Sequence, residues 1–234
     1  RPTHYRCCDP TLHPPSFGCD FTGITDNFTD YHGDVPDAIP YGEQEGYWGG
    51  WPGDRSFAAS GAEIPFQAWT NSGDPQVLRE GYLVARALVE FNDRHRDRLF
   101  HLPMFGHYGD WQALTKATPK GAVESFSAML ALNRTVLMAR ALGETADAKR
   151  YAAMLVAYKS AWHAAFFNSS TISYAGDTQT GNAMALYLDV PPTAAVRAQV
   201  IKALARAYSN ATVDGWAFSF FLSSSSSSSF SGDA

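Results

Sequence analysis

The chain has 234 residues, which is enough for one sizeable domain with a continuous core and too few for two complete ones. Hydrophobic residues make up 45% of it, charged residues 18%, and the formal net charge is -5. It therefore lacks the basic field that nucleic acid or an anionic membrane surface requires, and charges break its apolar runs before the roughly 20 residues of a spanning helix, so we expect neither partner.

Residues 1–29 form an irregular N-terminal segment in this prediction. Cys7, Cys8 and Cys19 lie there without a second cysteine or histidine cluster that would complete a zinc site, so no metal site is expected. The chain starts at Arg1, and any signal peptide would lie upstream of it. Acceptor sequons for N-glycosylation occur at Asn27, Asn133, Asn168 and Asn210. They suit a secreted protein but arise by chance at nearly this frequency, so localisation stays open.

Long loops with short extended pieces are predicted up to about residue 53, because this region is rich in Pro, Gly, Asp, Tyr and Trp and has no apolar period. Aromatic and acidic side chains are dense near its end: Tyr31, His32, Asp34, Asp37, Tyr41, Glu43, Glu45, Tyr47, Trp48, Trp51 and Asp54. Aromatic faces bind the C–H surfaces of sugars and carboxylates accept their hydroxyl protons, so the composition fits a saccharide pocket. A solvated acidic loop with a few packed aromatics explains it equally well.

Helices follow from about residue 54. The first is the apolar segment 56–70, which ends at Asn71-Ser72-Gly73. In the second, Asp74-Pro75 supplies an N-cap and a first-turn proline, and the helix continues to about residue 96. Its apolar residues recur at helical spacing: Val77, Val84, Leu88 and Phe91.

Four more helices complete the set of about six. Thr118-Pro119 opens the third, and Gly143 is placed as its C-terminal stop. Thr145 is predicted to cap the fourth. A shorter helix is expected from about Gln179 to Leu188, and another from about Thr193 to Tyr208.

The connections at 71–74 and 143–145 are so short that successive helices must be antiparallel neighbours. No strand pattern of convincing length appears in the helical part, so the predicted class is all-α. A bundle, a solenoid and an α/α barrel all remain open at this point. Residues 216–234, with seven consecutive serines at 223–229, have nothing to bury and are predicted to be a disordered tail.

A second candidate site lies in the connection before the third helix, at His107-Tyr108-Gly109-Asp110-Trp111. Trp111 beside Asp110 on a glycine-containing turn offers a sugar ring one stacking face and one acceptor, although a loop tryptophan folded back as a plug is equally consistent. In Asp177-Thr178-Gln179-Thr180, an N-capping role for Asp or Thr is favoured over ligand contact. Glu63, in an apolar helix, is either a buried acid of raised pKa or a residue at the helix edge.

Six segments occur in an order that resembles the catalytic domain of bacterial and fungal α-L-rhamnosidases. They are Asp34-Val35-Pro36-Asp37-Ala38-Ile39-Pro40, Asp54-Arg55-Ser56-Phe57, Gly73-Asp74, Gly109-Asp110-Trp111, Leu142-Gly143 and Asp177-Thr178-Gln179-Thr180. The resemblance implies an (α/α)6 barrel over residues 30–215, of which about six helices would be half. It also implies a pocket at one end of the barrel and inverting hydrolysis of terminal α-linked L-rhamnose, without a cofactor.

The resemblance further implies that Trp111 is a pocket tryptophan, and that Phe57 stands where the family carries a second one. The expected substrate-binding residues are Trp111, Asp110, Phe57, Asp54, Asp37 and Trp51. The family's general acid belongs to an Asp-Cys-Pro-x-Arg-Glu type motif and its general base to a Thr-x-Trp-Glu type motif. Neither motif is found, so we expect both catalytic carboxylates to lie outside this chain and the chain to be inactive alone.

Two other readings fit the same sequence. One is a non-catalytic carbohydrate-binding relative, and the other is a helical interaction scaffold without a ligand. A carbohydrate is the expected partner both of a glycoside hydrolase and of a carbohydrate-binding relative. The sequence leaves the sugar, the aglycone and the oligomeric state open.

Overall fold

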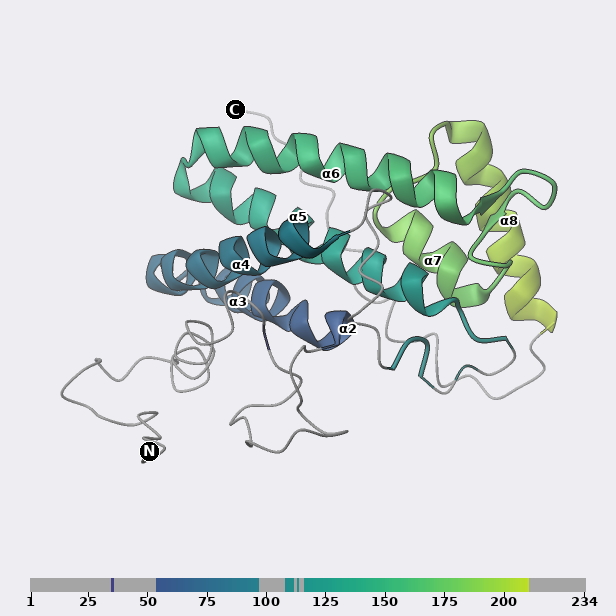
Figure 1. Ribbon diagram of the computed structural model, residues 1–234, viewed down its shortest axis with the longest axis horizontal. Coiled ribbons are helices and arrows are strands. Elements are labelled where there is room, and N and C mark those ends of the chain that lie inside the picture. Colours follow the sequence, from purple (N-terminus) through teal and green to yellow (C-terminus); the bar gives the residue numbers. More distant parts are fainter. Residues whose placement is uncertain (1–34, 36–53, 97–107, 112, 114–115, 211–234) are drawn as a thin grey trace.

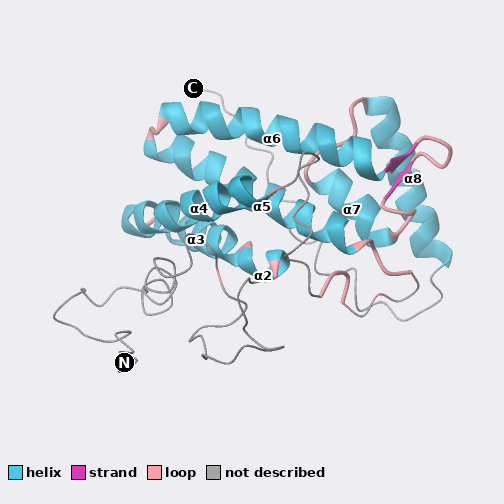
Figure 2. Ribbon diagram, in the orientation of Figure 1, coloured by secondary structure: helices cyan, strands magenta, loops and turns pink. Residues whose placement is uncertain are grey.

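A computed structural model describes residue 35 and residues 54–96, 108–111, 113 and 116–210. The described part is almost entirely helical, with one short antiparallel hairpin (Figures 1 and 2). Its elements are α2 (Arg55–Ala58), α3 (Ser60–Ser72), α4 (Pro75–His95), α5 (Lys120–Leu142), α6 (Thr145–Phe166), β1 (Phe167–Asn168), β2 (Ser173–Tyr174), α7 (Gln179–Tyr187) and α8 (Ala194–Asn210). The predicted all-α class is confirmed.

Several predictions fall outside the described residues: the irregular segment 1–29, the loop acids and aromatics that include Asp37 and Trp51, and the tail 216–234. Among the helices that are described, none combines the length and apolar character needed to cross a bilayer. The described residues also hold no group of three or more His, Cys, Asp and Glu side chains that could bind a metal ion.

The predicted helix 56–70 is divided into α2 and α3 at Ala59. An i→i+3 bond from the Ala62 N–H to the Ala59 carbonyl, 3.0 Å long, marks the junction as a tighter turn. The side chain of Val35 packs against this turn, because a Cβ on Gly61 would lie 2.9 Å from Val35 Cγ2. Gly61 therefore permits a close approach that a larger residue would block.

The C-terminal ends of α3 and α5 and the start of α4 follow the predicted punctuation, whereas the N-cap of α5 is Pro119 and not the expected Thr118. The Asp74 carboxylate accepts a hydrogen bond of 2.8 Å from the Gln76 N–H, with Pro75 as the first residue of α4. Gly73 and Gly143 close α3 and α5 in the left-handed region, at φ 70° and 76°. Two short links therefore join antiparallel helices, as the sequence predicts.

The prediction that Thr145 caps α6 is wrong. Glu144 occupies the N-cap position and makes no side-chain capping bond, while Thr145 is already the first helical residue. The Thr145 N–H donates to the Gly143 carbonyl at 2.8 Å, so the chain reverses within one residue of the left-handed glycine. That tight reversal starts the helix one residue earlier than the threonine signal suggests.

Helix α5 is the central element, with α6 on one side, α3 and α4 on another, and α7 and α8 near its N-terminal end (Figure 1). Two apolar clusters meet on it. One joins α5 mainly to α6, α7 and α8 and includes Val89 and Phe91 of α4, and the other joins α5 mainly to α2, α3 and α4 and includes Ala148 of α6. In the first cluster, buried Trp162 stacks on Tyr174 and donates its indole N–H to the Ala122 carbonyl at 3.1 Å. The indole is thus satisfied in the core.

Candidate functional site

The segment 108–111 is tied to the start of α2 by one carboxylate. Buried Asp54 is the N-cap of α2, and its Oδ1 accepts from the Ser56 N–H at 2.9 Å and from the Ser56 hydroxyl. Its Oδ2 accepts from the Tyr108 N–H, also at 2.9 Å. A carboxylate that receives backbone N–H groups from two segments fixes their relative position.

Three aromatic rings, those of Phe57, Tyr108 and Trp111, form a continuous group, which we call the aromatic face. The ring centroids of Phe57 and Tyr108 lie 5.2 Å apart, and those of Tyr108 and Trp111 lie 5.8 Å apart in an edge-to-face arrangement. Phe57 is 51% exposed and Trp111 is 61% exposed. Large aromatic side chains gathered at the surface mark a surface suited to ligand contact.

Asp110 precedes Trp111 of this face. Its carboxylate accepts hydrogen bonds from Thr118, in the segment that leads into α5. Its Oδ2 accepts from the Thr118 hydroxyl at 2.7 Å and from the Thr118 N–H at 3.2 Å. Gly109 next to it has φ 68°, and a Cβ there would lie 2.9 Å from Lys120 Cγ. The turn therefore depends on glycine for both its conformation and its close packing.

The start of α7 joins the same region. Thr178 is the N-cap of α7, and its hydroxyl oxygen accepts from the Gly181 N–H at 3.0 Å. The preceding Asp177 has φ 62°, with its Oδ1 accepting from Asn182 Nδ2 at 3.2 Å. Of the two residues proposed for the cap, the structure gives the role to Thr178. The first turns of α2, α5 and α7 thus lie at one end of the described helices (Figure 1).

The structure brings Asp54, Phe57, Asp110 and Trp111 together, and it does not describe Asp37 and Trp51. Sequence reasoning did not select Tyr108, although it stands in the quoted His107–Trp111 segment. It also missed the contact of Thr118 with Asp110, because Thr118 reads from the sequence only as a helix start. Contacts between residues distant in sequence carry no local signal, and only the fold reveals them.

A histidine–tyrosine pair lies behind the α7 turn. His163 Nδ1 and the Tyr174 hydroxyl are 2.7 Å apart, and the His163 ring stacks on Phe167. Burial lowers the pKa of His163 below its ordinary value and raises the pKa of Tyr174 to about 12. Both shifts favour the neutral side chains, as a structural contact does.

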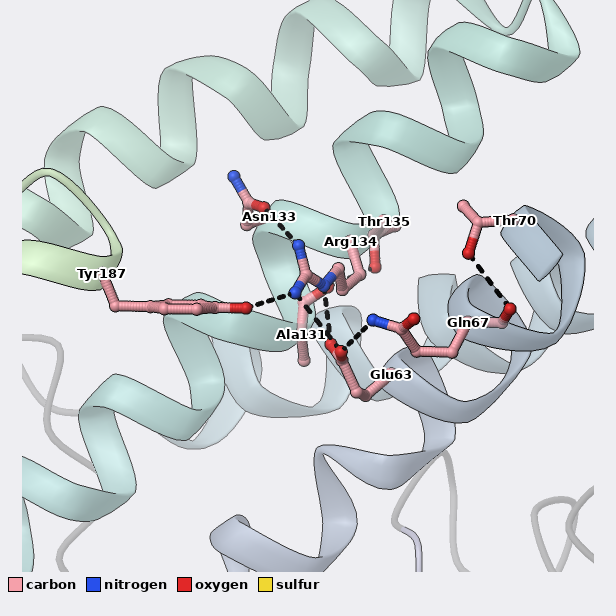
Figure 3. A network of polar contacts seen from close by, with 8 residues as sticks. All are labelled: Glu63, Gln67, Thr70, Ala131, Asn133, Arg134, Thr135 and Tyr187. Atoms are coloured by element: carbon pink, nitrogen blue, oxygen red, sulfur yellow. Dashed lines mark hydrogen bonds and ion pairs between the residues drawn. The ribbon is translucent and has the colours of Figure 1, made fainter. Parts of the chain in front are cut away.

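Away from the aromatic face, Glu63 proves to be an ion-paired residue at the side of α3. The Arg134 Nε donates to Glu63 Oε2 at 2.6 Å, and the Arg134 Nη2 donates to the Tyr187 hydroxyl at 2.6 Å (Figure 3). Gln67 Nε2 donates to Glu63 Oε1 at 2.8 Å. Burial opposes the charge of Arg134, but the hydrogen bond and charge of Glu63 outweigh it, so the pKa of Arg134 is raised.

Antiparallel helices joined by short links are the arrangement of a helical-hairpin domain. Residues 21–215 match the family described as the bacterial alpha-L-rhamnosidase 6 hairpin glycosidase domain. The chain belongs to this family of rhamnosidase-like glycoside hydrolases. Its fold is accordingly the predicted partial (α/α)6 barrel.

The relatives found are α-L-rhamnosidases. One from Streptomyces avermitilis is 28% identical over 142 residues, which are 61% of this chain and 13% of the relative. The crystal structure of that organism's enzyme complexed with L-rhamnose is similar with a TM-score of 0.70 and 23% identity, over 83% of this chain and 18% of that one.

Two further crystal structures show the same fold. The native enzyme from Aspergillus terreus gives a TM-score of 0.71 at 20% identity, over 83% of this chain and 23% of its own. The enzyme from Dictyoglumus thermophilum gives 0.70 at 25% identity, over 81% of this chain and 21% of its own. This chain therefore spans less than a quarter of the length of each of these relatives.

Proposed function

We propose that this chain supplies the sugar-binding end of a glycoside hydrolase that cleaves terminal α-linked L-rhamnose with inversion. The observation that carries the proposal is the aromatic face formed by Phe57, Tyr108 and Trp111, together with the Asp54 and Asp110 carboxylates that hold the segment 108–111 in place. The family supports the reaction class, and a structurally similar relative has been crystallised with L-rhamnose.

The aromatic face suits a deoxyhexose. L-rhamnose carries a methyl group and C–H bonds on its ring, which can lie against the exposed rings of Trp111 and Phe57 and remove their apolar surface from water. Asp110 lies beside Trp111, where a carboxylate oxygen can accept a hydrogen bond from a sugar hydroxyl. The pairing of stacking surface and acceptor orients the ring as well as binding it.

An inverting hydrolysis needs one carboxylic acid to protonate the leaving oxygen and one carboxylate to activate water, and it needs no cofactor. The two carboxylates at the aromatic face already hold the local structure. Asp54 receives N–H groups from α2 and from Tyr108, and Asp110 receives both donors of Thr118. We therefore assign Asp54 and Asp110 to binding and support, and place the catalytic acid and base outside the described residues.

Replacement of Trp111 by alanine tests the sugar-binding role. We expect Trp111→Ala to weaken binding of L-rhamnose by about 1–3 kcal/mol, because the stacking surface is lost. Calorimetric titration of the purified protein with L-rhamnose measures this. Val156→Ala, which truncates an exposed apolar side chain on α6, is the matched control and should bind as the parent does. Equal affinity of Trp111→Ala and the parent would remove Trp111 from the site.

The stereochemical outcome tests the reaction. Proton NMR during hydrolysis of an aryl α-L-rhamnoside, by a protein that carries this domain together with the catalytic acid and base, should show the β-anomer of L-rhamnose first, followed by slow mutarotation. Initial release of the α-anomer would contradict inversion. Rhamnose binding without turnover by this chain alone agrees with the proposal, whereas binding without turnover by a protein that also carries both carboxylates would favour the non-catalytic carbohydrate-binding alternative. The absence of any binding would leave the scaffold reading.

A further inference from the structure

Thr118 connects two segments that are far apart in the sequence. Its Oγ1 lies 2.7 Å from Asp110 Oδ2 on one side and 2.9 Å from Thr178 Oγ1 on the other. Thr118 and Thr178 are only 2% and 3% exposed, so these contacts are shielded from water. The Asp110 turn and the α7 cap are thus linked through one buried hydroxyl group.

The direction of each hydrogen bond follows from the number of protons available. A carboxylate only accepts, so the single proton of the Thr118 hydroxyl goes to Asp110. The Thr118 oxygen is then left to accept the proton of Thr178, whose own oxygen accepts the Gly181 N–H. The result is a directed relay from the first turn of α7 through two hydroxyl groups to Asp110.

The alternative acceptor for the Thr178 proton is weaker. The Ala175 carbonyl lies 3.3 Å from Thr178 Oγ1, beyond the usual range for a hydroxyl donor, whereas Thr118 lies at 2.9 Å. Geometry therefore favours Thr118 as the acceptor. Loss of the Thr118 hydroxyl would leave Thr178 with only this longer bond.

The turn before Thr178 adds a second reason for the link. Ala175, Gly176 and Asp177 have φ values of 49°, 76° and 62°, and left-handed backbone is costly for the two residues that are not glycine. Such a turn persists when its surroundings hold it. Lys116 Nζ donates to the Gly176 carbonyl at 3.0 Å, so the chain leading into α5 holds this turn at two points.

We infer that Thr118 is a positioning residue for the aromatic face. Thr118 holds Asp110, and with it the neighbouring Trp111, in a fixed place relative to α7. The inference rests on the proposed function, since it assigns this fixed place a purpose in sugar binding. Without the hydroxyl, the only hydrogen bond that Thr118 still donates to Asp110 is the one from its N–H, which is 3.2 Å long. The segment 108–111 would then move more freely, and Trp111 would stack less often in the orientation that binds sugar.

The test compares Thr118→Val, which keeps the shape and removes the hydroxyl, with Thr118→Ser, which keeps the hydroxyl. We expect Thr118→Val to weaken L-rhamnose binding roughly fivefold to tenfold. Thr118→Ser should bind L-rhamnose with an affinity within about twofold of the parent. Thr135→Val is the matched control. Thr135 is also buried in the protein, but its hydroxyl bonds the Ala131 carbonyl within α5, so this variant should bind as the parent does.

A second readout does not depend on the ligand. Amide hydrogen exchange of peptides covering residues 108–111 should be faster in Thr118→Val than in the parent, Thr118→Ser and Thr135→Val. Parent-like exchange and affinity in Thr118→Val would overturn the inference while leaving the proposed function intact. If the parent fails to bind L-rhamnose, the proposed function fails, and the exchange comparison still decides whether Thr118 holds the turn.

Discussion

At the scale of single residues, the structure shows that the acids of the candidate site support the local backbone, whereas the sequence suggests only that they accept hydrogen bonds from a sugar. Asp54 and Asp110 both read from the sequence as acceptors for a sugar. In the fold, each is first a support for a loop, because each accepts hydrogen bonds from residues on a neighbouring segment. A carboxylate that fixes an aromatic ring beside it contributes to binding through that ring.

The partly buried His163 predicts a pH dependence of stability. Its folded-state pKa is lowered by burial from an ordinary value of 6.5, so the unfolded chain binds more protons just below that pH. The contribution of His163 to stability is therefore present above about pH 6.5 and is lost as the pH falls through its folded pKa. Unfolding by urea at pH 7 and pH 5 should show a smaller loss of stability in His163→Gln than in the parent. Equal losses would contradict the shift.

At the scale of elements, the strongest local signals predicted the helices well. Asp74-Pro75 and the apolar spacing after it located α4, and Gly143 located the end of α5. The division at Ala59 was missed because it is a single tighter turn within one apolar segment. The hairpin of β1 and β2 was missed because two residues per strand are too few for an alternating pattern.

Sequence also located part of the candidate site. Trp111 was selected because it stands beside Asp110 on a glycine-containing turn, and Phe57 because the resemblance places it where the family carries a second tryptophan. The fold places both on one surface with Tyr108 between them. The Thr118–Thr178 contact could not be predicted, since it joins residues 60 positions apart through side chains that each have a local capping or helix-start explanation. Tertiary hydrogen bonds of this kind follow from packing and leave no periodic trace.

Arg134 joins three helices, and its removal should destabilise their packing. Its side chain on α5 is 12% exposed and pairs with Glu63 of α3 and Tyr187 of α7. We expect Arg134→Met to lower the free energy of unfolding by about 1–3 kcal/mol, because it leaves a partly buried carboxylate without its main donor. Urea unfolding measures the change.

The control is Arg197→Met, which removes a more exposed ion pair with Asp189. That variant should lose less than about 1 kcal/mol, as exposed pairs usually do. A loss in Arg134→Met no larger than in Arg197→Met would mean that the network in Figure 3 adds nothing to the packing of α3, α5 and α7.

At the scale of the whole molecule, α5 carries both the core and the approach to the candidate site. Residues along the whole helix belong to the two apolar clusters. Just before the helix, Thr118 bonds Asp110 and Lys116 bonds the turn that precedes α7. The aromatic face is therefore built on the ends of helices whose positions the core fixes. Rigid elements of this kind can present a loop tryptophan in a defined orientation.

The measurement that tests this account most directly is a crystal structure of the protein with L-rhamnose bound. The account predicts the sugar ring against Trp111 and Phe57, with a hydroxyl group within hydrogen-bond distance of the Asp110 carboxylate and with Thr118 still bonded to Asp110. Rhamnose bound at another surface, with the face of Phe57, Tyr108 and Trp111 left in contact with solvent, would contradict it.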